Sequence, residues 1–545
     1  MTRWFAFIAW LVAAAAAGLA WRGQGQPVPV VDAPGDRLPC VSYTPFRGAE
    51  SPHDESFVAS RANIEEDLRL LSAEVACVRT YAVDQGLDAV PEIAGRHGLK
   101  VLLGVWIGRD PLRNAQQIDV AVRLADQHRD VVRAVVVGNE VLLRREQTAA
   151  ALRGYIREVR RRVPVPVTYA DVWEFWLQNP EIAQDVDIVT IHLLPYWEDF
   201  PIAIGAAIDH VRDVWRKMAA EFPGKPILVG EIGWPSEGRM REGALPSRVN
   251  QARFVRGVLA AAARENVDIN LIEAFDQPWK QVQEGRVGGA WGMFTADREP
   301  KFPLSGPVAE DPAWSAKWIA ASLIALAAVA WAAARRGGRR PGALDWLAFA
   351  AAAEAAGACL VLGALRVAAT SWSFGDWVVG VGVLACGAVA AAAAAAAWLA
   401  GDRAAAFAPA GTRETLDLLA GGPGAFLTRR RAVLGLARLA PLFGAAATTF
   451  CLMVDARYRG FPVSLYALPL AAGVALAWLS AERARPAAED RLLALVLAAG
   501  SVAVAVSEGI GNVQSIGWAA LCVGAAACVA LGPGGRITPP TAAPR

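Results

Sequence analysis

The sequence predicts an α/β protein with a (β/α)8 TIM barrel, followed by an all-α polytopic transmembrane domain. Two observations predict this arrangement. Between residues 22 and 312, short β-rich runs alternate with helical stretches whose apolar residues recur at three-to-four spacing. After residue 313, the chain is mostly Ala, Leu, Val and Gly, in stretches long enough to cross a bilayer. The 54% share of hydrophobic residues is high for a soluble protein, and the excess lies in this second part.

Eight β-rich runs account for the barrel. They are residues 40–45, 76–82, 100–108, 133–141, 165–173, 187–197, 226–235 and 269–279. Helical stretches lie between them, for example 63–74, 148–163 and 250–266. Alternating strands and helices favour a parallel sheet, and eight such units fit a closed barrel. A doubly wound open sheet is the alternative, but no Gly-rich phosphate turn follows the first run and no P-loop is present.

The membrane part begins before the barrel. Residues 4–20 form an apolar stretch between two arginines, which is typical of a cleaved signal peptide or an uncleaved signal anchor. The length of the stretch favours an anchor at residues 1–21. The barrel domain then covers residues 22–312, and a transmembrane domain of about seven helices covers residues 313–545. The expected spans are 314–334, 343–365, 377–400, 433–454, 463–480, 491–507 and 516–532.

Basic segments between the spans indicate the orientation. Residues 335–340 (RRGGRR), 429–431 (RRR) and 481–491 (AERARPAAEDR) are expected in the cytoplasm, by the positive-inside rule. The barrel then lies on the opposite side of the lipid bilayer. Charges within or beside the spans are few, namely Glu354, Arg438, Asp455 and Glu508. These four are functional candidates, or they pair with each other or lie near an interface.

Cysteine and charge patterns limit the class of partner. Cys40 and Cys77 begin two similar strand-like runs, so they form a disulfide if those strands are neighbours, or they remain buried thiols. No CxxC motif or Cys/His cluster suggests a metal, and we expect no cofactor. The net charge of +2 and the lack of a basic aromatic patch argue against nucleic acid.

Polar and aromatic residues gather where the strands end. Barrel enzymes build their sites from the carboxyl ends of their strands. These ends supply Tyr43, Arg79, Tyr81, Trp106, Asn139, Glu140, Asp171, Trp173, His192, Tyr196, Trp197, Glu231, Trp234, Asp276 and Trp279. We expect Trp106, Trp173, Trp176 and Trp197 to line a cleft, and Trp215 to lie in the core. His192 belongs either to the site or to the core.

Two glutamates stand out among these residues, because Glu140 follows the fourth strand and Glu231 the seventh. In a barrel they face each other across the mouth. Cleavage of a glycosidic bond needs one carboxylic acid and one carboxylate, and aromatic rings stack on sugars. Arg79, if it lies near Glu231, keeps that group ionised, whereas Glu140 has fewer positive neighbours and is expected to stay protonated.

Four motifs in order resemble glycoside hydrolase family 17, which contains β-1,3-glucanases and glucanosyltransferases. They are VRTY (78–81), VGNEV (137–141), VGEIGWPSEG (229–238) and AFDQPWK with AWGMF (274–294). The resemblance covers about residues 38–302 and implies a retaining enzyme on a (β/α)8 barrel. By this resemblance, Glu140 is the acid/base, Glu231 is the nucleophile, and Asn139 binds the sugar 2-hydroxyl. Glu284 matches the family's glutamate before the last aromatic motif.

The chain departs from the family pattern at two positions. Leu194 stands where a Tyr is usual, which leaves open what orients the nucleophile, with Tyr196 as a candidate. Gln277 replaces a common Glu. The layout also resembles bacterial membrane-bound members linked to periplasmic β-glucans and often labelled glucan synthases. It implies a multi-pass protein of the bacterial inner membrane, with a periplasmic barrel.

The motifs leave the reaction open between hydrolysis and transfer, since both begin with the same glycosyl-enzyme on Glu231. A nucleotide-sugar synthase is not expected, because no donor-binding domain or QxxRW-like motif is present. The expected partners are a β-glucan, the lipid bilayer and a glucan synthesis or export complex. Two alternatives remain: a non-catalytic glucan-binding or export protein, and a membrane half that only anchors the barrel.

Overall fold

The computed structural model describes residues 2–335, 338–421, 429–455, 459–480 and 488–531. It divides into two compact units. One unit is the barrel, Pro27–Glu310, and the other combines residues 1–26 with residues 311–545. The first helix of the chain therefore belongs to the same unit as the carboxyl-terminal helices, although the barrel separates them in the sequence. Each unit is described below by itself.

Eight parallel strands form a closed barrel in the order β1 to β8. The strands are β1 (Val41–Ser42), β2 (Cys77–Arg79), β3 (Lys100–Val105), β4 (Val132–Asn139), β5 (Val167–Val172), β6 (Ile188–Leu193), β7 (Ile227–Ile232) and β8 (Asp268–Leu271). Val41 pairs with Val78 on one side and with Leu271 on the other, which closes the barrel. The predicted barrel is therefore confirmed, with one strand in each predicted run.

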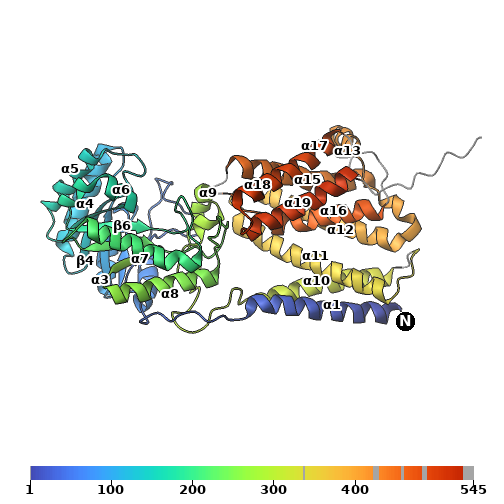
Figure 1. The fold of residues 1–545 in the computed structure, drawn as a ribbon, viewed down its shortest axis with the longest axis horizontal. Helices are drawn as coiled ribbons and strands as arrows, with labels where there is room; N and C mark the ends of the chain where they lie inside the picture. The colour runs from blue at the N-terminus through green and yellow to red at the C-terminus, as the bar shows by residue number, and fades with distance from the viewer. Residues whose placement is uncertain (1, 336–337, 422–428, 456–458, 481–487, 532–545) are drawn as a thin grey trace, which may run out of the picture. The chain divides into compact units, whose positions relative to one another are not determined.

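Helices surround this barrel (Figure 1). They are α2 (Arg61–Glu74), α3 (Val90–Arg96), α4 (Pro111–Gln127), α5 (Ala149–Arg160), α6 (Trp173–Gln178), α7 (Ile204–Glu221), α8 (Arg248–Glu265) and the short α9 (Gln281–Glu284). Side chains of Ser60, Asp110, Thr148 and Ser247 accept backbone N–H groups at the starts of α2, α4, α5 and α8. Such caps satisfy donors that the first turn leaves free, and thus define where these helices begin.

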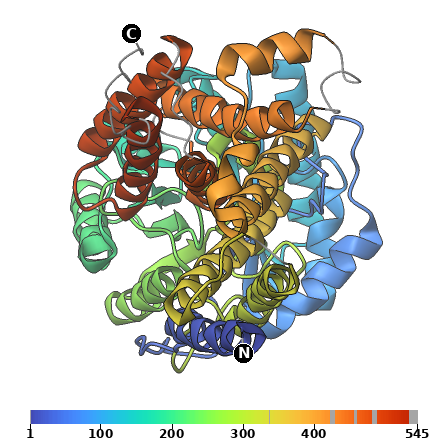
Figure 2. The same ribbon diagram turned by 90° about the vertical axis from the view of Figure 1, so that its right-hand side faces the viewer.

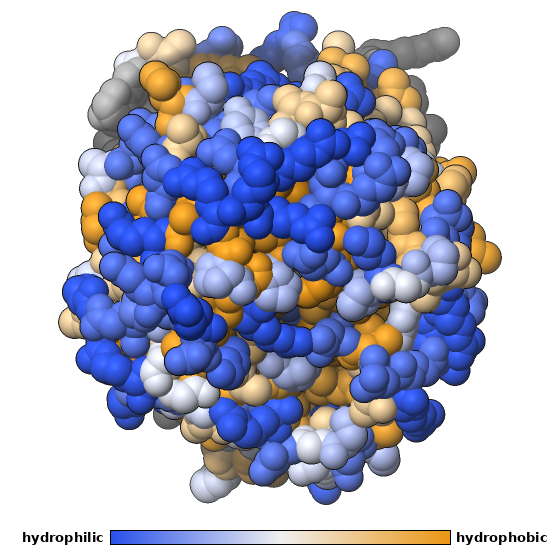
Figure 3. Space-filling model, turned by 90° about the vertical axis from the view of Figure 1, so that its left-hand side faces the viewer, coloured by the Kyte–Doolittle hydropathy of each residue, from blue (hydrophilic) through white to orange (hydrophobic). Residues whose placement is uncertain are grey.

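The interior of the barrel on the side away from its mouth, called the lower interior below, is lined by an apolar cluster. Cys40, Cys77, Leu102, Ala134, Val136, Ala170 and Leu228 form a buried cluster inside it. Cys40 and Cys77 are joined by a disulfide, because their strands are neighbours. The outer face of this unit in Figure 3 is mainly hydrophilic, with scattered hydrophobic residues. A water-exposed barrel wrapped in amphipathic helices has this distribution.

The second unit consists of helices. They are α1 (Thr2–Gly25), α10 (Trp314–Ala334), α11 (Ala343–Thr370), α12 (Phe374–Ala400), α13 (Thr412–Ala420), α15 (Arg430–Val454), α16 (Val463–Leu479), α17 (Ala488–Leu495), α18 (Ser501–Glu508) and α19 (Val513–Leu531). One π-helical turn, Val496–Gly500, joins α17 to α18. Helix α1 lies against α10 and α11, and α12 lies against α16 (Figures 1 and 2).

Six helices among the described residues are long and apolar enough to cross a membrane. They include α1, α10, α11 and α15, the stretch from α12 to Phe407, and the continuous segment Ala488–Glu508. The expected spans 463–480 and 516–532 form shorter apolar helices. Large apolar side chains are exposed on this unit, for example Phe374 (85%), Phe443 (64%) and Val506 (75%). Parts of the basic segments 335–340 and 481–491 lie outside the described residues.

The predicted charges of this unit have polar partners. Ser322 donates to Glu354 at 2.9 Å, and Asn512 donates to Glu508 at 2.9 Å. Arg438 lies 3.6 Å from Asp490, and Arg459 lies 3.3 Å from Asp455. In each of these contacts the partner is a residue outside the four, so the contacts do not show the expected pairing of the four with each other.

Candidate active site

A tight turn at the end of β4 positions Glu140. Gly138 has a φ of +89° and Glu140 a φ of +53°, both in the left-handed region. A Cβ at position 138 would lie 2.6 Å from Val141 Cγ2, so only glycine fits there. The backbone N–H of Glu140 donates to the carbonyl of Ala170 on β5 at 2.8 Å. The turn therefore holds the Glu140 carboxylate over the barrel mouth.

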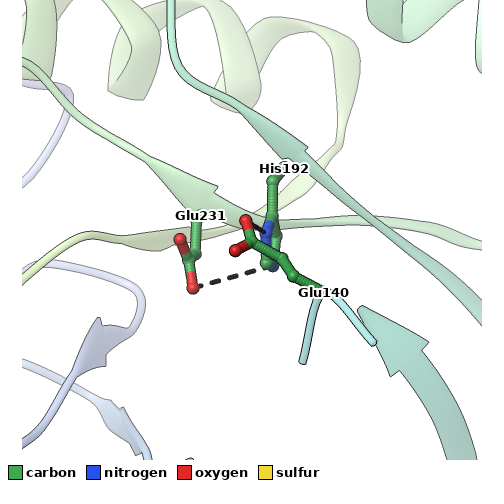
Figure 4. A group of neighbouring side chains, drawn as sticks. All are labelled: Glu140, His192 and Glu231. Atoms are coloured by element: carbon green, nitrogen blue, oxygen red, sulfur yellow. Dashed lines mark hydrogen bonds and ion pairs between the residues drawn. The ribbon is translucent and has the colours of Figure 1, made fainter. Parts of the chain in front are cut away.

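Glu231 approaches the same point from β7. The residue is 5% exposed, and its backbone is in register with His192 on β6. Figure 4 shows the side chain of Glu140, from the turn after β4, converging with those of His192 and Glu231 from β6 and β7. His192 Nδ1 lies 2.9 Å from Glu140 Oε1, and His192 Nε2 lies 3.7 Å from Glu231 Oε1. One oxygen of each glutamate lies within 4.8 Å of the other, which brings the two predicted carboxylates together.

Arg79 is the buried cation of this site. Its Nη1 donates to the Gly230 carbonyl at 2.6 Å and lies 3.5 Å from Glu231 Oε1. Its Nη2 donates to Asn139 Oδ1 at 2.6 Å. The expected proximity of Arg79 to Glu231 is confirmed. Because arginine only donates, Asn139 presents its oxygen to Arg79 and keeps its NH2 group for a further acceptor.

Tyr81 also binds Glu231. The Tyr81 hydroxyl donates to Glu231 Oε1 at 2.8 Å. Ser42 lies 3.0 Å from the same hydroxyl, and Asn270 donates to Ser42 at 2.8 Å. Burial, and then the charge of Glu231, raise the pKa of Tyr81 well above its usual value, so that it remains a donor.

The replacement of a usual Tyr by Leu194 left open which residue orients Glu231, and Tyr81 is in contact with it. The alternative candidate, Tyr196, is fully buried and donates to the Arg239 carbonyl. Sequence reasoning missed Ser42 and Asn270. The available signal was a polar residue within an otherwise apolar strand run.

The expected protonation of Glu140 needs a correction. Burial raises the pKa of Glu140, but the hydrogen bond with His192 and the charges of Arg144 and Arg79 outweigh burial, and the pKa lies below its usual value. The expectation failed because His192 reaches Glu140 from β6, and because Arg144 lies only four residues later, in the loop that turns back at Glu140.

Asp171 lies at the end of β5, behind Glu140. Its side chain is fully buried; it accepts the Tyr169 hydroxyl and the Val172 backbone N–H. Burial raises the pKa of Asp171 to about 6, and the charge of Glu140 adds to this shift. Asp171 is thus next to the site but turned into the protein, so the structure does not support direct contact with a substrate.

Four of the aromatic residues that we expected at the cleft are core residues. Tyr43, Trp176, Tyr196 and Trp234 are each at most 1% exposed. Tyr43 donates to Asp67, Trp176 to the Thr190 carbonyl and Trp234 to the Leu245 carbonyl. The prediction that they line the cleft or bind substrate is therefore wrong. Residues that follow the strand ends also form a buried layer beneath the barrel mouth, and these four belong to that layer. Trp215 is in the core, as expected.

Other predicted aromatic residues remain partly exposed around the barrel. Trp106 lies under the Arg144 guanidinium at 4.1 Å, and Trp173 lies under the Lys217 amine at 4.7 Å. Trp197 stacks on Trp291, and Trp279 makes edge contacts with Phe46 and His53. None of these ring contacts involves Glu140 or Glu231, and the role of the rings in sugar binding stays a prediction.

Two ion pairs lie on the segments after β8. Lys280 contacts both carboxylate oxygens of the buried Glu273, at 2.8 and 2.9 Å. Burial lowers the pKa of Lys280, but the charges of Glu273 and Glu284 raise it by more. The predicted role of Glu284, on α9, in substrate binding stays a prediction. Asp276 pairs with Lys301 at 2.6 Å.

The trio of Glu140, His192 and Glu231 has ligand atoms close enough to hold a metal ion. However, the Arg79 guanidinium lies 3.4 Å from His192 Nε2 and 3.5 Å from Glu231 Oε1. A fixed positive charge at this distance opposes a second cation. We therefore interpret the trio as a proton and hydrogen-bond network.

Comparison with known proteins gives consistent matches for the barrel. Residues 40–292 match the BtgE/BtgC glycoside hydrolase domain. A glucan 1,3-beta-glucosidase of Arthroderma benhamiae is 31% identical over 259 residues, which cover 44% of this chain and 84% of that protein. A probable glucan endo-1,3-beta-glucosidase btgC of Aspergillus clavatus is 26% identical over 306 residues, or 50% of this chain, and the match spans 43% of that relative's length.

Among solved structures, the family 17 β-1,3-glucanosyltransferase of Rhizomucor miehei matches with a TM-score of 0.44 and 23% identity, covering 49% of this chain and 98% of that one. The Arthroderma and Aspergillus relatives do not support the expected bacterial origin. The extent and identity of the Arthroderma match, together with the domain match, establish the family. The chain belongs to the BtgE/BtgC glycoside hydrolases, within the family 17 type of β-1,3-glucanases that its motifs resemble.

Proposed function

We propose that the barrel cleaves β-1,3-glucosidic bonds with retention of configuration and passes the glycosyl unit to water or to another glucan. The observation that carries this proposal is the pair of carboxylates from β4 and β7, with one oxygen of each within 4.8 Å of the other. Retaining glycosidases place their two carboxyl groups about 5 Å apart, and inverting enzymes place them farther apart. The named activities of the relatives support β-1,3-glucan as the substrate class.

In the first step, Glu231 attacks the anomeric carbon while Glu140 protonates the departing glycosidic oxygen. Tyr81 and Arg79 both contact Glu231 Oε1, so they hold that oxygen and leave Oε2 to act as the nucleophile. The C–O bond to the leaving sugar breaks, and a covalent glycosyl-enzyme forms on Glu231. Asn139, whose oxygen accepts from Arg79, uses its free NH2 group to donate to the 2-hydroxyl of the sugar in this proposal.

In the second step, Glu140, now a carboxylate, takes a proton from water or from a sugar hydroxyl. The oxygen of that acceptor attacks the anomeric carbon and displaces Glu231, which restores both carboxyl groups. Water gives hydrolysis, and a glucan hydroxyl gives transfer. The lowered pKa of Glu140 favours this base role.

We also propose that the protein is a multi-pass membrane protein with the barrel on the extracytoplasmic side. Six long apolar helices with exposed Phe, Val and Leu side chains support the membrane part. The disulfide between Cys40 and Cys77 supports an oxidising compartment for the barrel. Labelling of single cysteines in the loops between helices, by a membrane-impermeant reagent on intact cells, tests this topology.

Product analysis tests the proposed reaction. The full-length protein, purified in detergent, is incubated with laminari-oligosaccharides, and proton NMR follows the anomeric configuration of the first products. We expect β-anomers first, and longer oligosaccharides if transfer occurs. Glu231→Gln, which keeps the side-chain shape, is expected to lose on the order of 10⁴-fold in kcat. First products of α configuration, or full activity of Glu231→Gln, would exclude the mechanism and favour the glucan-binding alternative.

A further inference from the structure

We propose that His192 is the positioning residue of the acid/base, because it holds one oxygen of Glu140 and thereby selects the other oxygen to carry the catalytic proton. This inference rests on the proposed function of Glu140. His192 lies on β6 and is 1% exposed. It is locked between the two catalytic carboxylates, so its ring cannot reach a sugar without displacing one of them. Its role is therefore distinct from the substrate contact expected from the sequence.

The neighbours of His192 determine which ring nitrogen carries the proton. Arg79 Nη1 lies 3.4 Å from Nε2, and a guanidinium only donates, so Nε2 acts as the acceptor. The proton of the neutral ring is then on Nδ1. Nδ1 lies 2.9 Å from Glu140 Oε1, and this N–H donates to that oxygen. Arg79 thus fixes the tautomer, and the tautomer fixes the contact with Glu140.

This contact leaves Glu140 with two different oxygens. Oε1 accepts from His192, so a proton added to Glu140 resides on Oε2. Oε2 is therefore the oxygen that protonates the leaving group in the first step and that receives the acceptor's proton in the second. A carboxyl group held in this way needs no rotation between the two steps, which is the benefit of positioning.

The groups that face Glu140 determine the sign of the pH effect. They are His192 on β6, Arg79 on β2, Asp171 on β5, Glu231 on β7, and Arg144 on its own loop. The His192 N–H and the two arginines stabilise the carboxylate, whereas Asp171 and Glu231 oppose it when ionised. Loss of the His192 hydrogen bond therefore raises the pKa of Glu140. Since the first step needs protonated Glu140, the alkaline limb of kcat/KM moves to higher pH.

Two amide substitutions separate the two nitrogens of His192. The amide nitrogen of Asn occupies the place of Nδ1, so His192→Asn keeps the donor to Glu140. The amide of Gln reaches the place of Nε2, so His192→Gln keeps the contact with Arg79 and loses the donor to Glu140. We expect the alkaline limb of His192→Gln to move up by about one pH unit, and that of His192→Asn to stay within a few tenths of the wild type.

The acid limb serves as an internal control. It reports the ionisation of Glu231, which keeps Tyr81 and Arg79 in both variants, so we expect it to stay in place. On laminarin, His192→Gln is expected to lose about 10–100-fold in kcat/KM, because the catalytic proton of Glu140 is no longer confined to Oε2. On a dinitrophenyl β-glucoside, whose leaving group needs no proton, the first step should lose less than about threefold.

Thermal unfolding of both variants shows whether they are folded, and His192→Leu replaces His192→Gln if the latter is not. An unmoved alkaline limb in a folded His192→Gln or His192→Leu, or an equal shift in His192→Asn, would overturn the inference. Glu140→Gln distinguishes this failure from a failure of the proposed function. If Glu140→Gln remains fully active on laminarin, the function itself is wrong; if it is inactive while the histidine variants behave as wild type, only the role of His192 is wrong.

Discussion

The two ends of the barrel are built from the same eight strands and have opposite interiors. The lower interior holds aliphatic residues and one disulfide, represented by Leu102 and the Cys40–Cys77 pair. The mouth holds ionisable groups that are equally buried, with Arg79 and His192 each 1% exposed. Apolar burial stabilises the fold, whereas buried charges cost desolvation free energy that their partners must offset. The comparison predicts that substitutions at the lower end reduce stability. At the mouth, substitutions change chemistry, and those that remove a buried charge increase stability.

The largest expected effect on stability comes from the lower end. Leu102→Ala removes a side chain that is 1% exposed and leaves a cavity inside the barrel. We expect the free energy of unfolding to fall by about 2–5 kcal/mol, with an unchanged pH profile per folded molecule. Chemical denaturation and initial rates measure the two quantities. Leu102→Met is the volume-matched control. A shifted pH profile in Leu102→Ala would show that the two ends are not independent.

At the mouth, Asp171→Asn is expected to increase stability. Burial raises the pKa of Asp171 to about 6, from an ordinary value of 3.8. The contribution of Asp171 to the free energy of unfolding is thus fully present below pH 3.8 and is lost as the pH rises through about 6. Asn cannot ionise, so the variant should be more stable at pH 7, by at most about 3 kcal/mol, and should lose less stability between pH 4 and 6.

Denaturation of wild type and variant at several pH values checks this prediction. If Asp171→Asn is less stable than the wild type at pH 7, the ionised carboxylate is well stabilised by its neighbours, and the contrast between the two ends is weaker than proposed.

Tyr81→Phe gives the smallest expected effect, and it affects only chemistry. It removes the hydroxyl bound to Glu231 and keeps the ring below Arg79, where the guanidinium lies 4.8 Å from the ring centroid. We expect kcat to fall by about 10–100-fold, since the nucleophile loses its shorter hydrogen bond, while the melting temperature changes little. Steady-state kinetics and calorimetry test both parts. Unchanged kcat would mean that Arg79 alone orients Glu231.

The sequence was sufficient for the barrel and for its two glutamates. Eight runs at the spacing of βα units predicted the topology, and Glu140 and Glu231 stood at strand ends where barrel enzymes place their sites. The sequence was not sufficient to predict which residues after the strand ends are buried beneath the barrel mouth. Tyr196 and Trp234 follow their strands in the same way as the true site residues do, and only the packing of the loops buries them.

Side-chain contacts across the barrel could not be predicted from the sequence either. The contacts of His192 with Glu140, and of Tyr81 with Glu231, join residues separated by 52 and 150 positions. No local pattern encodes such contacts, because they depend on the side-chain rotamers that the closed barrel permits. For the same reason, the low pKa of Glu140 could not be predicted, whereas the apolar lower interior follows directly from the alternation of strand residues.

Covalent labelling of the nucleophile tests the central claim most directly. The full-length protein is treated with a 2-deoxy-2-fluoro-β-laminaribioside that carries a dinitrophenyl leaving group, and the labelled peptide is identified by mass spectrometry. Glu231 and Glu237 lie close together in the sequence, so fragmentation must separate them. We predict one glycosyl group per molecule, attached to Glu231 and absent from Glu231→Gln. A label on another residue, or turnover without any label, would contradict the proposed mechanism.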